Sequence, residues 1–329
     1  MENLFRNRRI RLFNDLSERK TIKKAVSALI LLLMSAVLST VGFAEVRDGT
    51  IKKPLRVMLV PSDTGADSIA DDFRPVFNAI TQVYGLYFDI KVGSSFSAVV
   101  EGMCNEQVDV AWLGVVTLPI VVNRGCGEFL ALDVKKGKSI YYSGIFVAKD
   151  SDIKILQDLK GKSMAFGDVL STSSFNFPVA MLIDAGIDPA QDLGKIYMAG
   201  SHTASLAALR EGRVDAACAS FNVYEKSVEN GIIDSKKFRI LKKSEPIPLP
   251  PMGMHIKLKP EVKALLKTAF NNVHKAPGIK PEQIRGYGGK MVDRFDADYS
   301  YENIESALRK LSAVTDEIKA SMIQKAGER

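Results

Sequence analysis

The chain has 329 residues, a formal net charge of +7, 46% hydrophobic residues and 25% charged residues. This composition is ordinary for a globular protein, and the length is enough for two lobes that each bury a core. The residues before Glu45 carry eight Lys or Arg against three Asp or Glu, so the remainder has a net charge of only +2. No basic stripe with interleaved aromatic residues follows, so the composition gives little support for nucleic-acid binding.

The N-terminal segment has the order of an export signal. Basic residues precede the apolar run Ala25–Val41, and the small-residue site Gly42-Phe43-Ala44 follows it. This order predicts a signal peptide over residues 1–44, cleaved after Ala44, and a periplasmic protein. The alternative is an uncleaved membrane anchor, because the apolar run is near the lower length for a spanning helix.

Strand-like and helix-like stretches alternate from residue 55 to residue 134. Short apolar runs that end at Pro or Gly predict strands, and apolar residues three or four apart predict helices. The predicted strands are Leu55–Val60, Leu86–Val92, Val108–Trp112 and Glu128–Val134. The predicted helices are Ala66–Tyr84, a helix from Ser95 to about Asn105, and Val116–Val122. This alternation predicts an α/β unit with a parallel sheet.

A second α/β unit follows the strand predicted at Tyr141–Ala148. Its further strands are predicted at Ser163–Phe166, Lys195–Met198, Ala216–Ala219 and Phe238–Lys242, with helices at Val179–Gly186 and from His202. The Pro-rich run 245–251 cannot form a regular helix, so we expect it to cross back to the first lobe. A helix at Lys259–Val273 and an amphipathic helix from Ile304 to Met322 complete the chain.

Hydroxyl side chains cluster where the strand at 163–166 gives way to the helix at 179–186. They are the side chains of Ser171, Thr172, Ser173 and Ser174. The first turn of a helix has unpaired N–H groups and a partial positive charge, so it binds anions, and hydroxyls add neutral donors. The alternative is a simple Ser/Thr helix cap with spare serines around it. Three consecutive hydroxyl residues in this position favour an oxyanion site.

This stretch resembles the Ser-Thr-Ser anion loop of the phosphate/phosphite/phosphonate-binding proteins of ABC transporters. The resemblance extends, in the same order, to Val108–Gly114, Tyr141–Val147 and Ala199–Thr203. It implies an α/β protein of the type II periplasmic binding-protein fold, with two α/β lobes joined by a two-crossing hinge and a ligand in the cleft between them. Residues 45–146 and 247–329 would form lobe 1, and residues 147–246 would form lobe 2.

The resemblance also assigns ligand-binding residues. They are Ser171, Thr172, Ser173, His202 and Tyr141. His202 begins a predicted helix and could donate to an oxyanion from a ring nitrogen, or it could be a capping or surface residue. Tyr141 and Tyr142 are adjacent in a predicted strand, so at least one of them packs away from the ligand.

Some positions depart from the family pattern. Phe96 stands where relatives carry an aromatic residue with a hydroxyl, so one expected hydrogen bond is missing. Asn222 and Pro250 stand where aminoalkylphosphonate binders carry acidic residues that hold an ammonium group. A ligand with an amine would lose its counter-charges here, which points toward phosphite, phosphate or a small alkylphosphonate. Phe96, Trp112 and Asn222 are possible cleft-lining residues, and core packing is the alternative for Trp112.

The remaining features are assigned to structural roles. An exported protein meets an oxidising compartment, and we expect a disulfide between Cys104 and Cys126 in the first lobe, with Cys218 unpaired in the second. Asp109 and Asp215 are expected to be structural residues at strand starts. The stretch Gly286–Gly289 has no Walker lysine and no strand–loop–helix context, so it is not predicted to bind a nucleotide.

The sequence therefore predicts a non-enzymatic, exported solute-binding protein. It would capture a small phosphorus oxyanion and present it to an ABC permease in the membrane, with no metal or other cofactor and no nucleic acid. One alternative is an enzyme on the same fold, although no Ser–His–Asp order and no metal-spaced Cys/His cluster is evident. Another is a ligand-sensing domain that serves a separate membrane signalling protein. The oligomeric state is not predicted.

Overall fold

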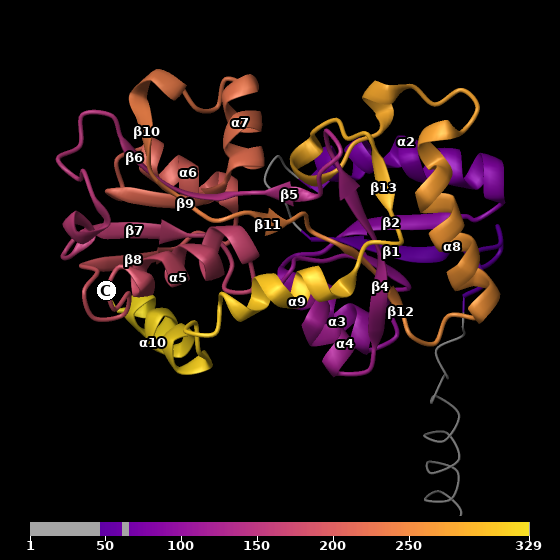
Figure 1. Cartoon of the computed structure of the whole chain (residues 1–329), viewed down its shortest axis with the longest axis horizontal. Helices are drawn as coiled ribbons and strands as arrows, with labels where there is room; N and C mark the ends of the chain where they lie inside the picture. Colours follow the sequence, from indigo (N-terminus) through magenta and orange to yellow (C-terminus); the bar gives the residue numbers. More distant parts are fainter. Residues whose placement is uncertain (1–46, 61–65, 329) are drawn as a thin grey trace, which may run out of the picture. The chain divides into compact units, whose positions relative to one another are not determined.

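The computed structural model describes residues 47–60 and 66–328. The predicted signal segment and its cleavage site lie outside the described residues, as do residues 61–65 and residue 329. The described part contains two main β-sheets flanked by helices (Figure 1). None of its helices combines the length and the apolar character needed to cross a bilayer.

The first sheet is built from both ends of the described chain. Its strands are β1 (Leu55–Leu59), β2 (Phe88–Val92), β3 (Val110–Trp112), β4 (Gly127–Val134), β12 (Met252–His255) and β13 (Arg294–Asp296). They lie in the order β13-β4-β12-β3-β1-β2. β1 is parallel to β2 and β3, whereas β12 is antiparallel to β3 and β4. The sheet is mixed rather than parallel as predicted, because β12 and β13 enter it after the chain has returned from the second sheet.

The second sheet comes from the middle of the chain. Its strands are β6 (Ser143–Ala148), β7 (Ser163–Phe166), β8 (Lys195–Met198), β9 (Ala216–Ser220) and β10 (Phe238–Lys243). Their order is β10-β6-β9-β7-β8. β7 is parallel to β8 and β9, while β6 is antiparallel to β9 and β10. Each sheet therefore has a parallel part formed by β–α–β units and an antiparallel part next to the connections between the lobes.

Helices flank both sheets, and some of them begin at a serine or threonine side chain that accepts an early amide. The longer ones are α2 (Ala66–Tyr84), α3 (Phe96–Cys104), α4 (Thr117–Asn123), α5 (Phe177–Asp184), α6 (His202–Arg210), α7 (Phe221–Glu229), α8 (Pro260–Asn272), α9 (Tyr301–Arg309) and α10 (Asp316–Gly327). The short ones are the 3₁₀ helices η1 (Leu156–Leu159), η3 (Ser235–Lys237), η4 (Val273–Lys275), η5 (Pro281–Gln283) and η6 (Tyr287–Gly289), and the π-helix η2 (Thr172–Asn176). Ser95, Ser201 and Ser220 cap α3, α6 and α7 by accepting a backbone N–H three residues on.

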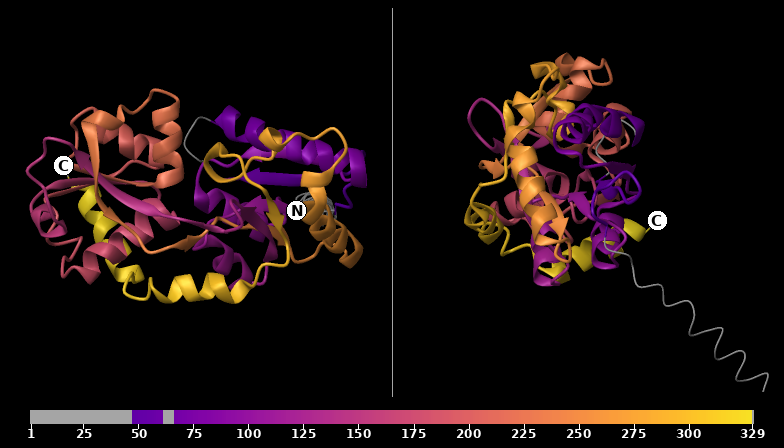
Figure 2. Two further views of the ribbon diagram at one scale, coloured as in Figure 1. Left: turned by 45° about the horizontal axis from the view of Figure 1, so that its top comes forward. Right: turned by 90° about the vertical axis from the view of Figure 1, so that its right-hand side faces the viewer.

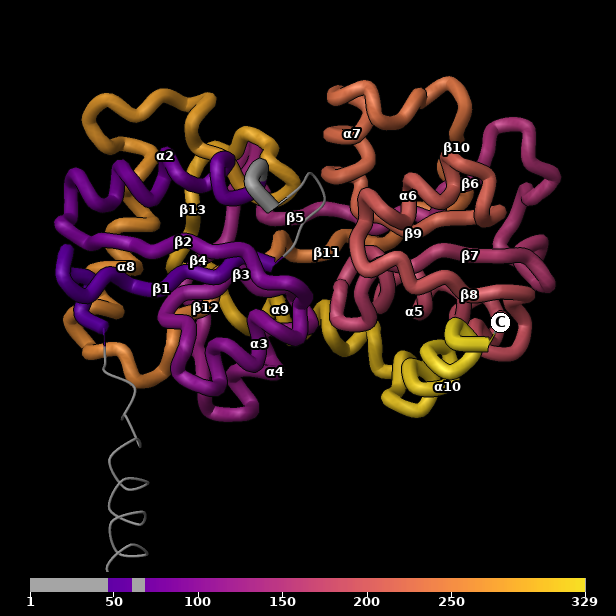
Figure 3. Tube along the Cα trace, turned by 180° about the vertical axis from the view of Figure 1, so that it is seen from behind, coloured from indigo at the N-terminus to yellow at the C-terminus, as the bar shows by residue number. Residues whose placement is uncertain are grey.

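A two-stranded ribbon joins the two sheets. It pairs β5 (Ile140–Tyr141) with β11 (Ile247–Pro248) in antiparallel register, and Figures 1 and 3 show the two strands running side by side between the sheets. The strand predicted over 141–148 is thus interrupted at Tyr142, and the second sheet begins at Ser143 rather than after residue 146. The Pro-rich run crosses back as predicted, and it pairs over only two residues because proline has no N–H to donate.

The C-terminal segment differs from the sequence prediction. A single amphipathic helix in the first lobe is predicted through residues 304–322, but the structure has two helices, α9 and α10, separated by residues 310–315. α10 packs against β8 of the second sheet, and the Lys325 ammonium donates to the Ala190 carbonyl at 2.8 Å. Figure 2 shows this yellow segment passing from one sheet to the other. Apolar residues recur every three or four positions in both α9 and α10, because each helix buries an apolar face. This pattern therefore does not reveal the interruption between them.

The hydrophobic cores consist of buried side chains of the strands and of the helices packed against them. In β1, Leu55, Val57 and Leu59 are buried and alternate with partly buried residues. Phe73 of α2 packs edge-on against Trp112 of β3, with ring centroids 4.1 Å apart. Fully burying a large apolar side chain stabilises the fold by about 1.5–3 kcal/mol, so these rings fix α2 on the sheet that positions the loop after β3.

The cysteines are placed as the sequence suggests. Cys104, at the end of α3, and Cys126, just before β4, form a disulfide with Cα atoms 4.9 Å apart. Cys218 lies buried and unpaired in β9, where burial raises the pKa of its thiol. Both partners of the disulfide flank the first sheet, so the bond ties α3 to the start of β4.

Candidate functional site

Four loops meet where parallel strands end. β7 is followed by residues 167–171, β8 by residues 199–201, and β9 by the start of α7 at Ser220. On the first sheet, β3 is followed by residues 113–116. Ligands of open α/β sheets bind at the carboxyl ends of such strands, so these loops define the candidate site.

The hydroxyl-rich stretch forms the start of a π-helix. Ser171 is its N-cap, and its Oγ accepts the Ser174 N–H at 3.2 Å. The Asn176 N–H donates to the Ser171 carbonyl at 3.1 Å, five residues back rather than four. Short π-helical turns occur mainly as local bulges and are frequent at functional sites. The wider turn moves the helix start to Thr172, several residues before the helix predicted at 179–186.

The N-terminal turn of η2 offers backbone donors. Thr172 and Ser173 are the first residues of η2, so their N–H groups have no acceptor further back in the same helix. The Thr172 Oγ1 accepts the Val116 N–H of the first lobe at 3.2 Å. A Cβ on Gly114 would lie 3.1 Å from the same oxygen, so the glycine lets the loop approach. Open amides and the helix dipole together favour an anion here.

His202 begins α6 and is buried. Its Nδ1 accepts the Ser220 backbone N–H at 2.9 Å. A backbone N–H can only donate, so the proton of the neutral imidazole lies on Nε2. Nε2 is 3.2 Å from the Ser171 Oγ. His202 therefore presents an N–H donor to the space bordered by the hydroxyl-rich loop.

Tyr141 reaches the same loop from β5. Burial raises the pKa of Tyr141, and side-chain hydrogen bonds with Ser173 and Thr172 act in the opposite direction. The phenol therefore remains protonated at neutral pH and can donate. The structure thus brings the five predicted ligand residues together, with Tyr141 beside the loop and His202 beside its N-cap.

Tyr287 also belongs to this cluster, and the sequence analysis does not identify it. Its hydroxyl donates to the Ser220 Oγ at 3.0 Å and lies 3.4 Å from the His202 Nε2. Its ring is edge-on to Tyr141, with centroids 5.1 Å apart. The available sequence signal is an aromatic residue among glycines in Gly286–Gly289, but no local pattern connects that loop with residues more than sixty positions away.

The glycines of this loop have packing reasons. A Cβ on Gly286 would overlap the carboxylate of Asp133. Gly288 has φ +70°, which side chains rarely adopt. The loop therefore lies close against the first sheet.

The three residues predicted to line the cleft lie in different surroundings. Trp112 is buried, and its indole N–H donates to the Pro250 carbonyl at 3.1 Å, so it packs in the core behind the site. Phe96 is buried at the start of α3. The Asn222 side-chain amide donates to the Tyr287 carbonyl at 3.3 Å. Asn222 therefore holds the neighbouring loop and brings no charge.

Asp109 and Asp215 have the structural roles expected of them. The Asp109 carboxylate accepts the backbone N–H of Arg56 and two guanidinium hydrogen bonds at 2.7–2.8 Å. Asp215 accepts the backbone N–H and the hydroxyl of Ser163. Each carboxylate joins two neighbouring parallel strands at their start, away from the carboxyl ends.

The electrostatics of the cluster depend on neutral donors. Within the described residues, no group of three His, Cys, Asp or Glu side chains is arranged to hold a metal ion. Behind the cluster, Asp133 accepts the Tyr287 N–H at 2.6 Å, and burial raises the pKa of Asp133 to about 7. Among the described residues of the cluster, the donors are thus hydroxyl, phenol, imidazole N–H and amide groups, and none of them carries a fixed positive charge.

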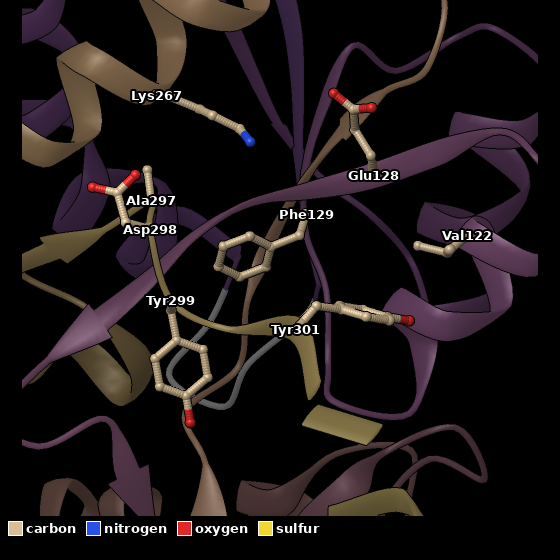
Figure 4. Close-up of a pocket in the computed structure, with 8 residues that line it drawn as sticks. All are labelled: Val122, Glu128, Phe129, Lys267, Ala297, Asp298, Tyr299 and Tyr301. Carbon is tan, nitrogen blue, oxygen red and sulfur yellow. The ribbon is translucent and has the colours of Figure 1, made fainter. Parts of the chain in front are cut away.

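An open pocket elsewhere in the first lobe has a different character. It has a volume of about 540 Å³, and Figure 4 shows its lining residues: Val122, Glu128, Phe129, Lys267, Ala297, Asp298, Tyr299 and Tyr301. None of the predicted ligand residues lines it. Two carboxylates accompany its one lysine, so the pocket is not suited to an anion.

Comparison with known proteins identifies the family. A profile described as "ABC transporter, phosphonate, periplasmic substrate-binding protein" matches residues 58–290. The chain belongs to this family. The chain is thus a periplasmic substrate-binding protein of a transport system. Such a protein binds a small ligand and has a membrane permease as its partner. The resemblance inferred from the Ser-Thr-Ser stretch is confirmed.

Individual relatives agree with this assignment. The chain is 29% identical over 223 residues to a phosphate-import protein, PhnD, of Mycolicibacterium smegmatis, covering 64% of this chain and 69% of that one. It is 27% identical to a phosphonates-binding periplasmic protein of Escherichia coli, covering 67% of this chain and 66% of that one.

Solved structures agree on the fold. A binding-protein component of an ABC phosphonate transporter from Pseudomonas aeruginosa has a TM-score of 0.65 at 20% identity, covering 82% of this chain and 98% of that one. A Prochlorococcus marinus protein, PhnD1, in complex with methylphosphonate has a TM-score of 0.64 at 20% identity, covering 79% and 98%. The predicted type II periplasmic binding-protein fold is confirmed.

Proposed function

We propose that this protein captures a small phosphorus oxyanion, namely phosphite, phosphate or a small alkylphosphonate, and presents it to the permease of an ABC importer. The supporting observation is that Tyr141, His202 and the N-terminal turn of η2 are all buried and lie next to one another. Each hydrogen bond to a charged acceptor contributes roughly 1.5–3 kcal/mol. Several such donors around a tetrahedral anion bind it without a metal or a fixed positive charge.

The ligand in this proposal carries no amine. Asn222 is neutral and its amide is engaged with Tyr287, while Pro250 offers only a carbonyl, which accepts from Trp112. An ammonium group at these positions would be desolvated without a carboxylate partner. The names of the relatives, which include phosphate import and a methylphosphonate complex, are compatible with an amine-free ligand.

A calorimetric panel tests the proposal. The protein beginning at Glu45 is titrated with phosphate, phosphite, methylphosphonate, aminoethylphosphonate and sulfate. We expect an amine-free phosphorus oxyanion to bind most tightly and aminoethylphosphonate to bind at least about 10-fold more weakly, a difference of about 1.4 kcal/mol. Asn222→Glu is the matched variant, and it should reduce the difference in affinity between the amine-free ligand and aminoethylphosphonate. A wild-type protein that binds aminoethylphosphonate most tightly contradicts the ligand assignment.

The Ser171–His202 contact raises the alternative of a hydrolase, because a serine next to a histidine can be a nucleophile with its base. The hydrogen bonds favour binding instead. The Nδ1 of His202 accepts the backbone N–H of Ser220 rather than donating to a carboxylate, so the proton on Nε2 makes this nitrogen a donor toward Ser171 and not a base. Phosphorus NMR of methylphosphonate incubated with the protein should show no product, and a new phosphorus signal would support the enzyme.

A further inference from the structure

Tyr287 is held by the first lobe but reaches the second. Its backbone N–H donates to the buried Asp133 carboxylate of β4 at 2.6 Å. Its hydroxyl lies 3.0 Å from the Ser220 Oγ and 3.4 Å from the His202 Nε2, both on the second lobe. The side chain is only 6% exposed. A first-lobe phenol is therefore placed against the histidine that borders the oxyanion site.

Within the described residues, the phenol shares its partner Ser220 with a backbone amide. Ser220 caps α7, and its Oγ also accepts the Val223 N–H at 3.2 Å. The serine oxygen keeps this bond when the Tyr287 hydroxyl leaves it. The His202 Nε2 proton points into the same space, so an oxyanion there can accept from both His202 and Tyr287. Charge-assisted hydrogen bonds of this kind are stronger than the neutral one they replace.

We propose that Tyr287 is a ligand-contacting and size-limiting residue of the oxyanion site, contributed by the first lobe. The proposal rests on the proposed function and names a specificity residue for it. The hydroxyl supplies an aromatic donor that Phe96 lacks. The ring, with centroids 5.1 Å from Tyr141 and 6.0 Å from Trp112, occupies volume that a longer substituent on phosphorus would need.

A neighbouring contact provides a control. Lys290 follows the same loop, and its ammonium donates to Glu229 of α7 at 2.5 Å. This ion pair joins the same two segments as Tyr287, and within the described residues Lys290 pairs with Glu225 and Glu229 rather than with His202 or the hydroxyl-rich loop. Lys290→Met therefore loosens the junction between the lobes without removing a donor from the site.

Three variants and one ligand series test the proposal. Tyr287→Phe, Tyr287→Leu and Lys290→Met are titrated with phosphite, phosphate, methylphosphonate and propylphosphonate, with circular dichroism as a check on folding. Tyr287→Phe should raise the Kd for methylphosphonate about 10-fold. Tyr287→Leu should raise the affinity ratio of propylphosphonate to methylphosphonate at least about 10-fold. Lys290→Met should change all Kd values by one common factor and leave that ratio unaltered.

Two outcomes overturn the inference separately from the proposed function. If Tyr287→Phe binds every ligand as the wild type does while Thr172→Val loses binding, the site is correct and Tyr287 is not part of it. If the Tyr287 variants shift all ligands by the same factor as Lys290→Met, Tyr287 is only a structural link. A wild-type protein that binds no member of the series overturns both proposals.

Discussion

Ser171 and Thr172 are neighbours with different tasks in the structure. The Ser171 Oγ caps η2 through the Ser174 N–H, whereas the Thr172 Oγ1 faces the first lobe and is next to Tyr141. The sequence alone leaves open which hydroxyl is the cap and which are ligand donors. The hydrogen bonds separate the two roles, so single substitutions can test them independently.

Thr172→Val should weaken oxyanion binding about 10- to 100-fold, because it removes one donor to a charged acceptor and keeps the shape of the side chain. Calorimetry measures the affinity and thermal melting measures the stability. Ser174→Ala is the control, because the Ser174 Oγ is buried against Gly167 and has no partner among the described residues; it should change affinity much less. A Thr172→Val protein that melts earlier but binds normally would show that the loop is only a cap.

Asp133 should make stability depend on pH. Burial raises its pKa to about 7, whereas an unfolded aspartate titrates near 3.9. Between these values the folded state holds a proton that the unfolded state releases, so the free energy of unfolding falls as pH rises, by at most about 1.4 kcal/mol per pH unit. The contribution is complete below the unfolded pKa and is lost as pH rises through the folded one.

Urea unfolding at about pH 5 and about pH 8 checks this prediction. The side chain at position 133 cannot titrate in the Asp133→Asn variant. The free energy of unfolding of Asp133→Asn should therefore fall less with rising pH than that of the wild type. Asp150→Asn, at an exposed position, is the control and should follow the wild-type curve. Parallel curves for wild type and Asp133→Asn would mean that the carboxyl titrates normally.

At the scale of elements, local patterns predicted most strands and helices and failed where distant contacts decide. The alternating burial of β1 and the Ser95 cap of α3 are readable from neighbouring residues. The antiparallel entry of β12 and the position of η6 depend on which segments meet after the chain has crossed between lobes. Tyr287 is not predicted as a site residue for this reason, because its partners lie in β4, in α6 and at the start of α7.

The Cys104–Cys126 disulfide, with Cα atoms 4.9 Å apart, should be present in the exported protein. If unstrained, it should stabilise the fold by about 3 kcal/mol. Peptide mapping without reduction should recover the two cysteines in one linked peptide and Cys218 as a thiol. Recovery of Cys104 and Cys126 as unmodified thiols from exported protein would contradict the pairing.

At the scale of the whole molecule, family membership fixes a periplasmic substrate-binding protein, while the start of the mature chain is still a prediction. The basic and apolar order before Gly42-Phe43-Ala44 predicts that the exported protein begins at Glu45. N-terminal sequencing of protein from the periplasmic fraction should read Glu-Val-Arg. An intact N-terminus recovered with the membrane would instead indicate an anchor.

The placement of α10 on the second sheet sets a mechanical limit on opening. Residues 310–315 join α9 to α10, and the seven Cα–Cα steps from Arg309 to Asp316 span at most about 25 Å when fully extended. The end of α9 and the start of α10 cannot move further apart than this while α10 stays on β8. Any opening of the lobes that exceeds the full extension of this segment therefore requires α10 to detach from β8.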